Sequence, residues 1–164
     1  MPKEELTHFD SDGRVQMVDV TAKAETSRRA LAAGQIRLTP EVMARLKAGG
    51  VGKGDPVSVA ELAGVMGAKK TSDLIPLCHP LPLSSVNIRI TSDDTEPVLR
   101  VEAEVKTKGT TGVEMEALTA VSIACLTLYD MLKAVDKGMV IGEVRLLEKD
   151  GGKSGNWRRE DGDG

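Results

Sequence analysis

The sequence predicts an α+β fold of ferredoxin-like type, in which an antiparallel sheet carries helices packed on one face. Three observations lead to this prediction. Two segments alternate apolar and polar residues and are joined by a short polar turn, as in a β-hairpin. A long, mostly apolar segment without proline has the length of a helix. The predicted elements follow one another in the order β–α–α–β–β–α–β.

The first half of the chain is predicted to supply one strand and one capped helix. We expect about ten polar residues at the N-terminus to be mobile. The segment 20–38 contains helix formers, but we favour a strand for its second half. A helix over 38–50 has Thr39 as its N-cap and Pro40 in its first position, and glycines end it.

A second helix is predicted after the linker VGKGD. Ser58 and Glu61 have the spacing of a capping box, which would begin this helix. The helix should stop before Pro76 because the residue before a proline disfavours helical geometry.

The second half of the chain is predicted to complete the sheet. Strands are expected at 85–91, 98–106 and 140–149, with a long helix over about 113–136. We therefore predict a single domain over residues 1–157. The charged residues 158–164 are predicted to form a disordered tail.

Composition excludes several classes of protein. With 2% aromatic residues and a net charge of −3, the 164-residue chain has neither an aromatic platform for nucleic acid nor a basic DNA-binding footprint. Two cysteines, Cys78 and Cys125, cannot form a disulfide framework for a domain of this size, which indicates a reducing compartment. The chain shows neither the apolar stretch of a signal peptide nor an apolar run that we expect to span a membrane. We expect a cytoplasmic protein.

The predicted long helix carries a polar stripe that is a candidate catalytic feature. Asp130 and Lys133 are spaced to touch on one helical face. A solvated face with a surface salt bridge is the plain alternative. We favour a sheltered stripe because small polar residues occupy its middle and the rest of the helix is apolar. A lysine beside a buried acid can act as a general acid or base. The stripe consists of Glu116, Thr119, Ser122, Asp130, Lys133 and Lys137.

The segment before this helix, KTKGTTGVEME, is a candidate anion site. Free N–H groups and the helix dipole favour negative charge at a helix N-terminus. The same segment contains Thr111-x-x-Glu114, which is itself a capping box, so Glu114 is either a cap or a site residue. Glu116 lies at the edge of the polar stripe and is the better site candidate.

The segment DLIPLCHPLPL places Cys78 and His79 side by side among three prolines. The ligand spacing matches no zinc pattern, and adjacent residues in an extended chain point apart, which disfavours a Cys–His nucleophile. Two interpretations remain: an apolar loop with an incidental cysteine, or a stiff loop that presents backbone groups and an imidazole to a ligand. Basic residues recur elsewhere and could converge on a polyanionic small molecule: Arg28, Arg29, Lys53, Lys69, Lys70, Lys149 and Lys153.

Two long segments, KKTSDLIPLCHPLPL and KTKGTTGVEMEALTAVSIACLTLYDMLKAVDKGMVIGEVRLLEKDGGKSG, closely resemble the cyclic pyranopterin monophosphate synthase family. The resemblance extends from about His8 to Trp157. It implies a ferredoxin-like subunit, a hexamer built as a trimer of dimers, and active sites at subunit interfaces. The implied reaction converts 3′,8-cyclo-7,8-dihydroguanosine 5′-triphosphate to cyclic pyranopterin monophosphate and pyrophosphate, an early step of molybdenum cofactor biosynthesis.

The resemblance also assigns roles to individual residues. The family's catalytic aspartate corresponds to Asp130, its essential lysine to Lys133, and Lys53 matches a further lysine implicated in catalysis. The substrate-binding positions correspond to Leu77, Cys78, His79, Met115, Glu116, Glu114, Arg28 and Lys149. No cofactor, metal, nucleic acid or membrane partner is expected. A non-catalytic ferredoxin-like module that binds a nucleotide as a regulator remains the alternative.

Overall fold

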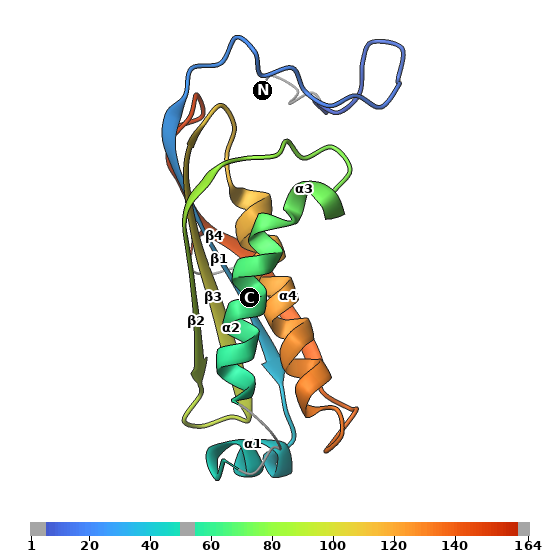
Figure 1. Cartoon of the computed structure of the whole chain (residues 1–164), viewed down its shortest axis with the longest axis vertical. Helices are drawn as coiled ribbons and strands as arrows, with labels where there is room; N and C mark the ends of the chain where they lie inside the picture. Colours follow the sequence, from blue (N-terminus) through green and yellow to red (C-terminus); the bar gives the residue numbers. More distant parts are fainter. Residues whose placement is uncertain (1–5, 50–54, 161–164) are drawn as a thin grey trace.

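The computed structural model describes residues 6–49 and 55–160, and its centre is a five-stranded antiparallel sheet of order β2-β3-β1-β4-β5. Two helices, α2 (Pro56–Lys69) and α4 (Glu114–Leu132), cover one face of the sheet (Figure 1). This arrangement confirms the predicted ferredoxin-like α+β fold. The strands are β1 (Thr26–Arg37), β2 (Leu83–Ser92), β3 (Val98–Gly109), β4 (Val140–Asp150) and β5 (Trp157–Arg158).

The ambiguous N-terminal segment forms the central strand β1. Ala32 of β1 pairs with Ala103 of β3 on one side and with Leu146 of β4 on the other. The side chains of Ala30, Ala32 and Ile36 are fully buried. Pairing on both edges outweighs the local helix preference of this alanine-rich stretch, because strand formation depends on the packing context.

The helix boundaries confirm one predicted cap and correct another. In α1 (Pro40–Lys47) the Thr39 hydroxyl accepts a hydrogen bond from the Val42 N–H at 3.3 Å, as predicted. The capping box predicted for α2 is wrong, because Asp55 is the N-cap and accepts from the Val57 N–H at 3.0 Å. Glu61 instead accepts from the Ile90 N–H at 3.3 Å. A one-turn helix, α3 (Thr71–Leu74), follows α2 and was not predicted.

Helix α4 is the core helix of the domain. Its length and its mean hydropathy of 1.4 would allow it to cross a membrane, although we expected no segment to do so. Its burial identifies it as a core helix instead, because it packs against α2, β1 and β3. Its buried residues are Glu116, Ala117, Thr119, Ala120, Val121, Ala124, Cys125, Leu128 and Leu132.

The N-terminal end of the described chain lies outside the sheet, whereas its C-terminal end forms the edge strand β5. The segment 6–25 runs across one end of the sheet and carries an isolated bridge between Phe9 and Val15 (Figure 1). At the other end of the chain, β5 pairs with β4, and the Arg159 N–H donates to the Leu147 carbonyl at 2.8 Å. The disorder predicted for 158–164 is therefore wrong at Arg158 and Arg159.

Candidate active site

Three segments that are distant in sequence enclose a cavity of about 260 Å³ at the N-terminal end of α4. We call it the inner cavity. The N-terminal segment, the proline loop after α3, and the start of α4 each form one wall. Six of the predicted site residues line it: Leu77, Cys78, His79, Glu114, Met115 and Glu116. The other lining residues are Thr7, His8, Val18, Val20, Lys23, Leu81, Thr111 and Gly112.

Hydrogen bonds hold the proline loop in place. The Cys78 N–H donates to the Ile75 carbonyl at 3.1 Å, and the buried Thr107 hydroxyl donates to the Pro82 carbonyl at 2.6 Å. The His79 Nε2 lies 2.7 Å from the Val18 carbonyl oxygen. Because a carbonyl only accepts, Nε2 carries the proton in this contact. His79 therefore fastens the N-terminal segment against the loop, which joins two walls of the inner cavity.

Glu116 is the most perturbed carboxyl group of the inner cavity. Its side chain is only 4% exposed, and burial raises its pKa to about 7, with a further contribution from the negative charge of Glu114. Burial also raises the pKa of the Cys78 thiol, and the charge of Glu116 adds to this effect. A carboxyl group with a pKa near neutrality can both give and take a proton. Cys78 stays a neutral thiol, which disfavours a nucleophilic role.

Glu114 lies where the inner cavity meets a second one. The capping box predicted with Thr111 is not formed, because Val113 is the N-cap of α4 and no side chain caps it. The Glu114 carboxylate instead lies against Gly112, where a Cβ atom would overlap it. Glu114 and Gly112 line both cavities, which favours the interpretation of Glu114 as a site residue.

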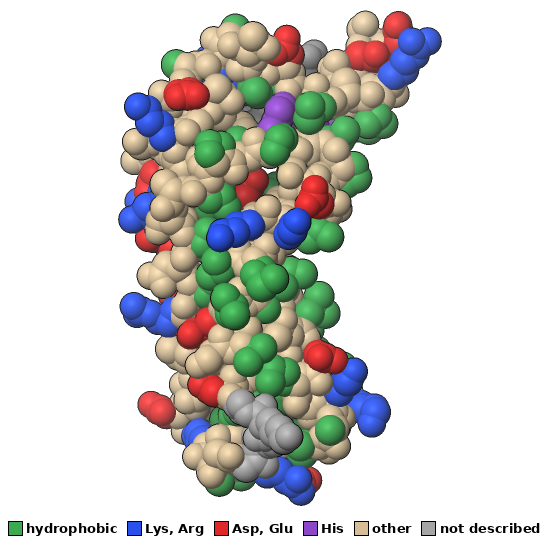
Figure 2. All heavy atoms as spheres, viewed as in Figure 1, with side chains coloured by type: hydrophobic (Ala, Val, Ile, Leu, Met, Phe, Trp, Pro, Cys, Tyr) green, Lys and Arg blue, Asp and Glu red, His purple; other side chains and the backbone are tan. Residues whose placement is uncertain are grey.

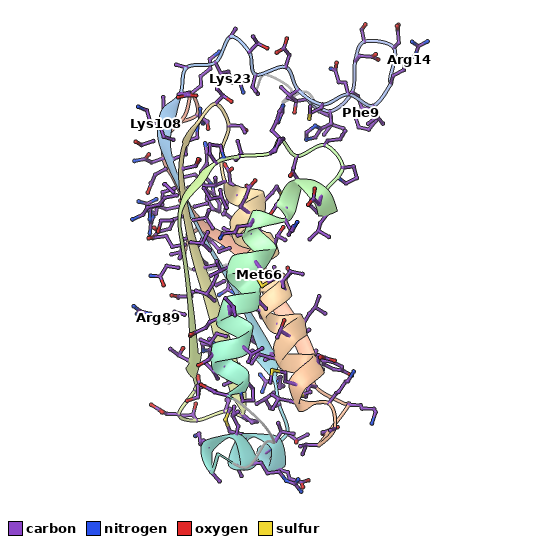
Figure 3. The ribbon with its side chains drawn as sticks, in the orientation of Figure 1. Phe9, Arg14, Lys23, Met66, Arg89 and Lys108 are labelled. Atoms are coloured by element: carbon purple, nitrogen blue, oxygen red, sulfur yellow. The ribbon has the colours of Figure 1, made fainter. Side chains whose placement is uncertain are left out.

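The second cavity is about 900 Å³ in volume and is lined by four cationic side chains, so we call it the basic cavity. Arg28 comes from β1, Lys149 from β4, Lys153 from the loop after β4, and Lys23 from the N-terminal segment. Lys23 lines both cavities, and Figure 3 shows it close to the start of β1. Four cations around one cavity of an acidic protein favour an anionic ligand.

The predicted catalytic pair lies at the opposite end of α4. The Lys133 Nζ is 2.8 Å from the Asp130 Oδ1, and this ion pair raises the pKa of Lys133. The side chains are 51% and 71% exposed, respectively, so the sheltered stripe predicted from the sequence is wrong for this half of the helix. Glu116 and Asp130 are separated by about 21 Å along the helix axis, at ~1.5 Å per residue. Lys53 lies outside the described residues.

The structure therefore brings together some predicted residues and separates others. Arg28, Lys149 and Lys153 line the basic cavity, which meets the inner cavity at Glu114, whereas Lys69 and Lys70 line neither cavity. Lys23 was missed, because no spacing or motif in AKAETSRR distinguishes it from a surface lysine. Within 6–49 and 55–160, no group of three or more His, Cys, Asp and Glu side chains is arranged to hold a metal ion.

Comparison with known proteins identifies the family of the chain that forms these cavities. The MoaC family model matches residues 17–152, which include every predicted site residue. This chain belongs to the MoaC family. Three curated relatives agree with the match over nearly their whole length, and each is named cyclic pyranopterin monophosphate synthase.

The three relatives of this chain come from three different organisms. The protein of Dinoroseobacter shibae is 57% identical over 94% of this chain and 98% of its own. The protein of Thermomicrobium roseum is 54% identical over 96% of this chain and 95% of its own length. The protein of Cereibacter sphaeroides is 59% identical over 93% of this chain and 96% of its own length. The family and the enzyme class that the sequence motifs predict are confirmed.

Proposed function

We propose that this chain converts 3′,8-cyclo-7,8-dihydroguanosine 5′-triphosphate to cyclic pyranopterin monophosphate, with release of pyrophosphate, in molybdenum cofactor biosynthesis. The observation that carries this proposal is the chemical contrast between the two adjoining cavities. The inner cavity offers a buried carboxyl group, a thiol and an imidazole, whereas the basic cavity offers four cations. A substrate with a purine-derived ring at one end and a triphosphate at the other matches that contrast.

In this proposal the basic cavity carries out the phosphate chemistry. A ribose hydroxyl oxygen attacks the α-phosphorus and forms a new P–O bond. At the same time the bond between the α-phosphorus and the oxygen that bridges to the β-phosphate breaks, and pyrophosphate leaves. Arg28, Lys149, Lys153 and Lys23 stabilise the negative charge that develops on the departing oxygens. The hydroxyl proton passes to a basic group of the site or to water.

The inner cavity holds the ring in this proposal. Leu77, Cys78 and His79 form one wall against it, and Met115 and Glu116 form another. Rearrangement of the ring requires proton transfers at several atoms. With a pKa of about 7, Glu116 exchanges protons at the pH of the cytoplasm, where we place the protein.

Asp130, Lys133 and Lys53 complete the catalytic set in this proposal, and a second copy of the chain brings the first two to the cavities. Two observations support this. Asp130 and Lys133 are exposed at the end of α4 that is remote from the inner cavity. Large apolar side chains also lie exposed on the helical face, where Figure 2 shows apolar atoms gathered over α2 and α4: Val59, Leu62, Met66 and Leu126. A hexamer built as a trimer of dimers is the assembly we propose.

Turnover distinguishes this proposal from a non-catalytic module that binds a nucleotide as a regulator. The purified chain is incubated with the cyclised GTP intermediate, and pyrophosphate and the pterin product are measured. The proposal predicts both products in equal amounts without an added cofactor. Binding of the intermediate without turnover would support the regulatory module instead. The names of the relatives do not favour that module.

A further inference from the structure

A hairpin at the end of the described chain carries part of the basic cavity. Strand β4 ends at Asp150, a loop follows, and β5 returns antiparallel with Lys149 opposite Trp157. Lys149 and Lys153, two of the four cations of the basic cavity, belong to this hairpin. Figure 1 shows its loop, in red, beside the start of β1, which carries Arg28. The position of the hairpin therefore decides where several cations meet.

An ion-pair network fastens this hairpin to the sheet. Arg158 Nη1 lies 2.7 Å from Asp150 Oδ1, and Arg158 Nε lies 3.7 Å from Glu148. Arg29, on the neighbouring strand β1, pairs with the same two carboxylates at 2.6 Å to Glu148 and 3.1 Å to Asp150. Asp150 and Glu148 are less than a third exposed. Several linked charges in partly buried positions hold geometry better than one isolated surface pair.

The loop of the hairpin fits closely against Arg28. Gly151 and Gly152 have φ angles of +91° and +81°, a backbone conformation that residues other than glycine rarely adopt. A Cβ atom at Gly152 would overlap the Arg28 Nη1 atom. Arg28 also donates from Nε to the Gly109 carbonyl at 2.9 Å. The loop thus supports the guanidinium of Arg28 from one side, while β3 holds it from the other.

We infer that Arg158 and Asp150 are positioning residues: their ion pair fixes the β4–β5 hairpin so that Lys149, Lys153 and Arg28 converge on the anionic end of the substrate. This inference rests on the proposed function for the identity of the ligand. Neither residue lines the basic cavity, so each acts through the hairpin and not by touching the ligand. Arg158 falls in the segment that the sequence predicted to be a disordered tail.

Charge alone and positioning predict opposite results for one substitution. Asp150→Asn removes a negative charge near the basic cavity, so a purely electrostatic account expects tighter binding of an anion. The positioning account expects weaker binding, because Arg158 and Arg29 lose a carboxylate that holds the hairpin. The sign of the change therefore separates the two accounts without relying on its size.

The test measures pyrophosphate binding by titration calorimetry for the wild type, Asp150→Asn, Arg158→Ala, Arg158→Lys and Arg37→Ala. Arg37 is the matched control, because it pairs with Glu96 at 3.2 Å and is about as exposed as Arg158. We expect binding to weaken about 5- to 10-fold in Asp150→Asn and Arg158→Ala, by less in Arg158→Lys, and by no more than about 2-fold in Arg37→Ala. A lysine keeps the charge of Arg158 but not its forked geometry.

Several outcomes would overturn the inference. They are Asp150→Asn binding pyrophosphate as tightly as the wild type or more tightly, Arg158→Ala behaving like Arg37→Ala, and a wild type that does not bind pyrophosphate. Thermal melting of each variant confirms that the domain is folded before binding is compared. With the substrate, positioning predicts a raised KM together with a lowered kcat, because the displaced cations both bind the phosphates and stabilise the charge that develops on the departing pyrophosphate. Absence of wild-type turnover would overturn the proposed function instead, and the pyrophosphate series does not depend on turnover.

Discussion

The two ends of α4 carry the candidate chemistry in opposite ways. At the N-terminal end, Glu116 is buried in a cavity enclosed by three segments of the same chain, and its pKa is raised to about 7. At the C-terminal end, Asp130 and Lys133 form an exposed ion pair. Burial gives Glu116 its perturbed proton affinity within one chain. The exposed pair would gain a comparable environment only when another surface covers it.

The largest expected effect concerns the exposed end of the helix. Lys133→Ala should lower turnover of the cyclised GTP intermediate by at least about 10³-fold, because in the proposed mechanism Lys133 exchanges protons with the substrate. Pyrophosphate release gives the rate. The melting temperature should barely change, because exposed ion pairs contribute little to stability.

A lysine on the same end of the helix provides the control for this variant. Lys137 is exposed, was predicted to lie on the same polar stripe, and follows Lys133 by four residues in the loop beyond the end of α4. Lys137→Ala should keep turnover within about 2-fold of the wild type. Near-normal activity in Lys133→Ala would show that the exposed end of α4 takes no part in the reaction.

A smaller effect is expected at the buried end. Glu116→Gln should lower turnover by about 10²-fold and remove the ionisation near pH 7 from the pH–rate profile, because the amide cannot exchange the proton. A variant that keeps that ionisation would contradict the role of Glu116.

Glu116 also makes a prediction for stability. Because its pKa is about 7 in the folded chain and ordinarily 4.5, the folded state binds more protons between these values, and stability falls as pH rises through this window. Glu116→Gln removes that loss. In urea titrations, the free energy of unfolding of the variant minus that of the wild type should therefore be larger at pH 8 than at pH 5 by roughly 2–3 kcal/mol.

The smallest effect is expected at the junction of the two cavities. Gly112→Ala would place a Cβ atom where the Glu114 carboxylate lies, and the carboxylate would have to move. Turnover should fall about 10-fold, since a small displacement of a site group is costly. Gly142→Ala is the control, because a Cβ atom there meets nothing within 4 Å. Equal rates in the two variants would exclude a positional role for Gly112.

The sequence predicted most of the fold because its signals are local. Alternating residues define β2 and β3, and Thr39 and Pro40 mark the start of α1. Strand β5 was missed because two residues carry no periodicity, and they become a strand only by pairing with β4. The capping box at Ser58 was wrong because Asp55, three residues earlier, offers a better cap.

The candidate site was only partly predictable, for a physical reason. The proline loop and the start of α4 have distinctive residues, and the structure brings them together at one cavity. Lys23 joins them only through the path of the N-terminal segment, which His79 fastens at Val18. The helical wheel placed Glu116 and Asp130 in one sector, but a wheel omits the distance along the axis. The residues of the stripe therefore share one face of α4, but Glu116 and Asp130 lie at opposite ends of that face.

Mixing two inactive variants tests most directly whether the two ends of α4 serve one active site shared between copies. Lys133→Ala and Glu116→Gln chains are unfolded together, refolded as a mixture, and assayed for pyrophosphate release. If each site takes Lys133 from one copy and Glu116 from another, random dimers regain about a quarter of wild-type activity, because half are mixed and each mixed dimer has one intact site. A mixture no more active than its two components would contradict the shared site.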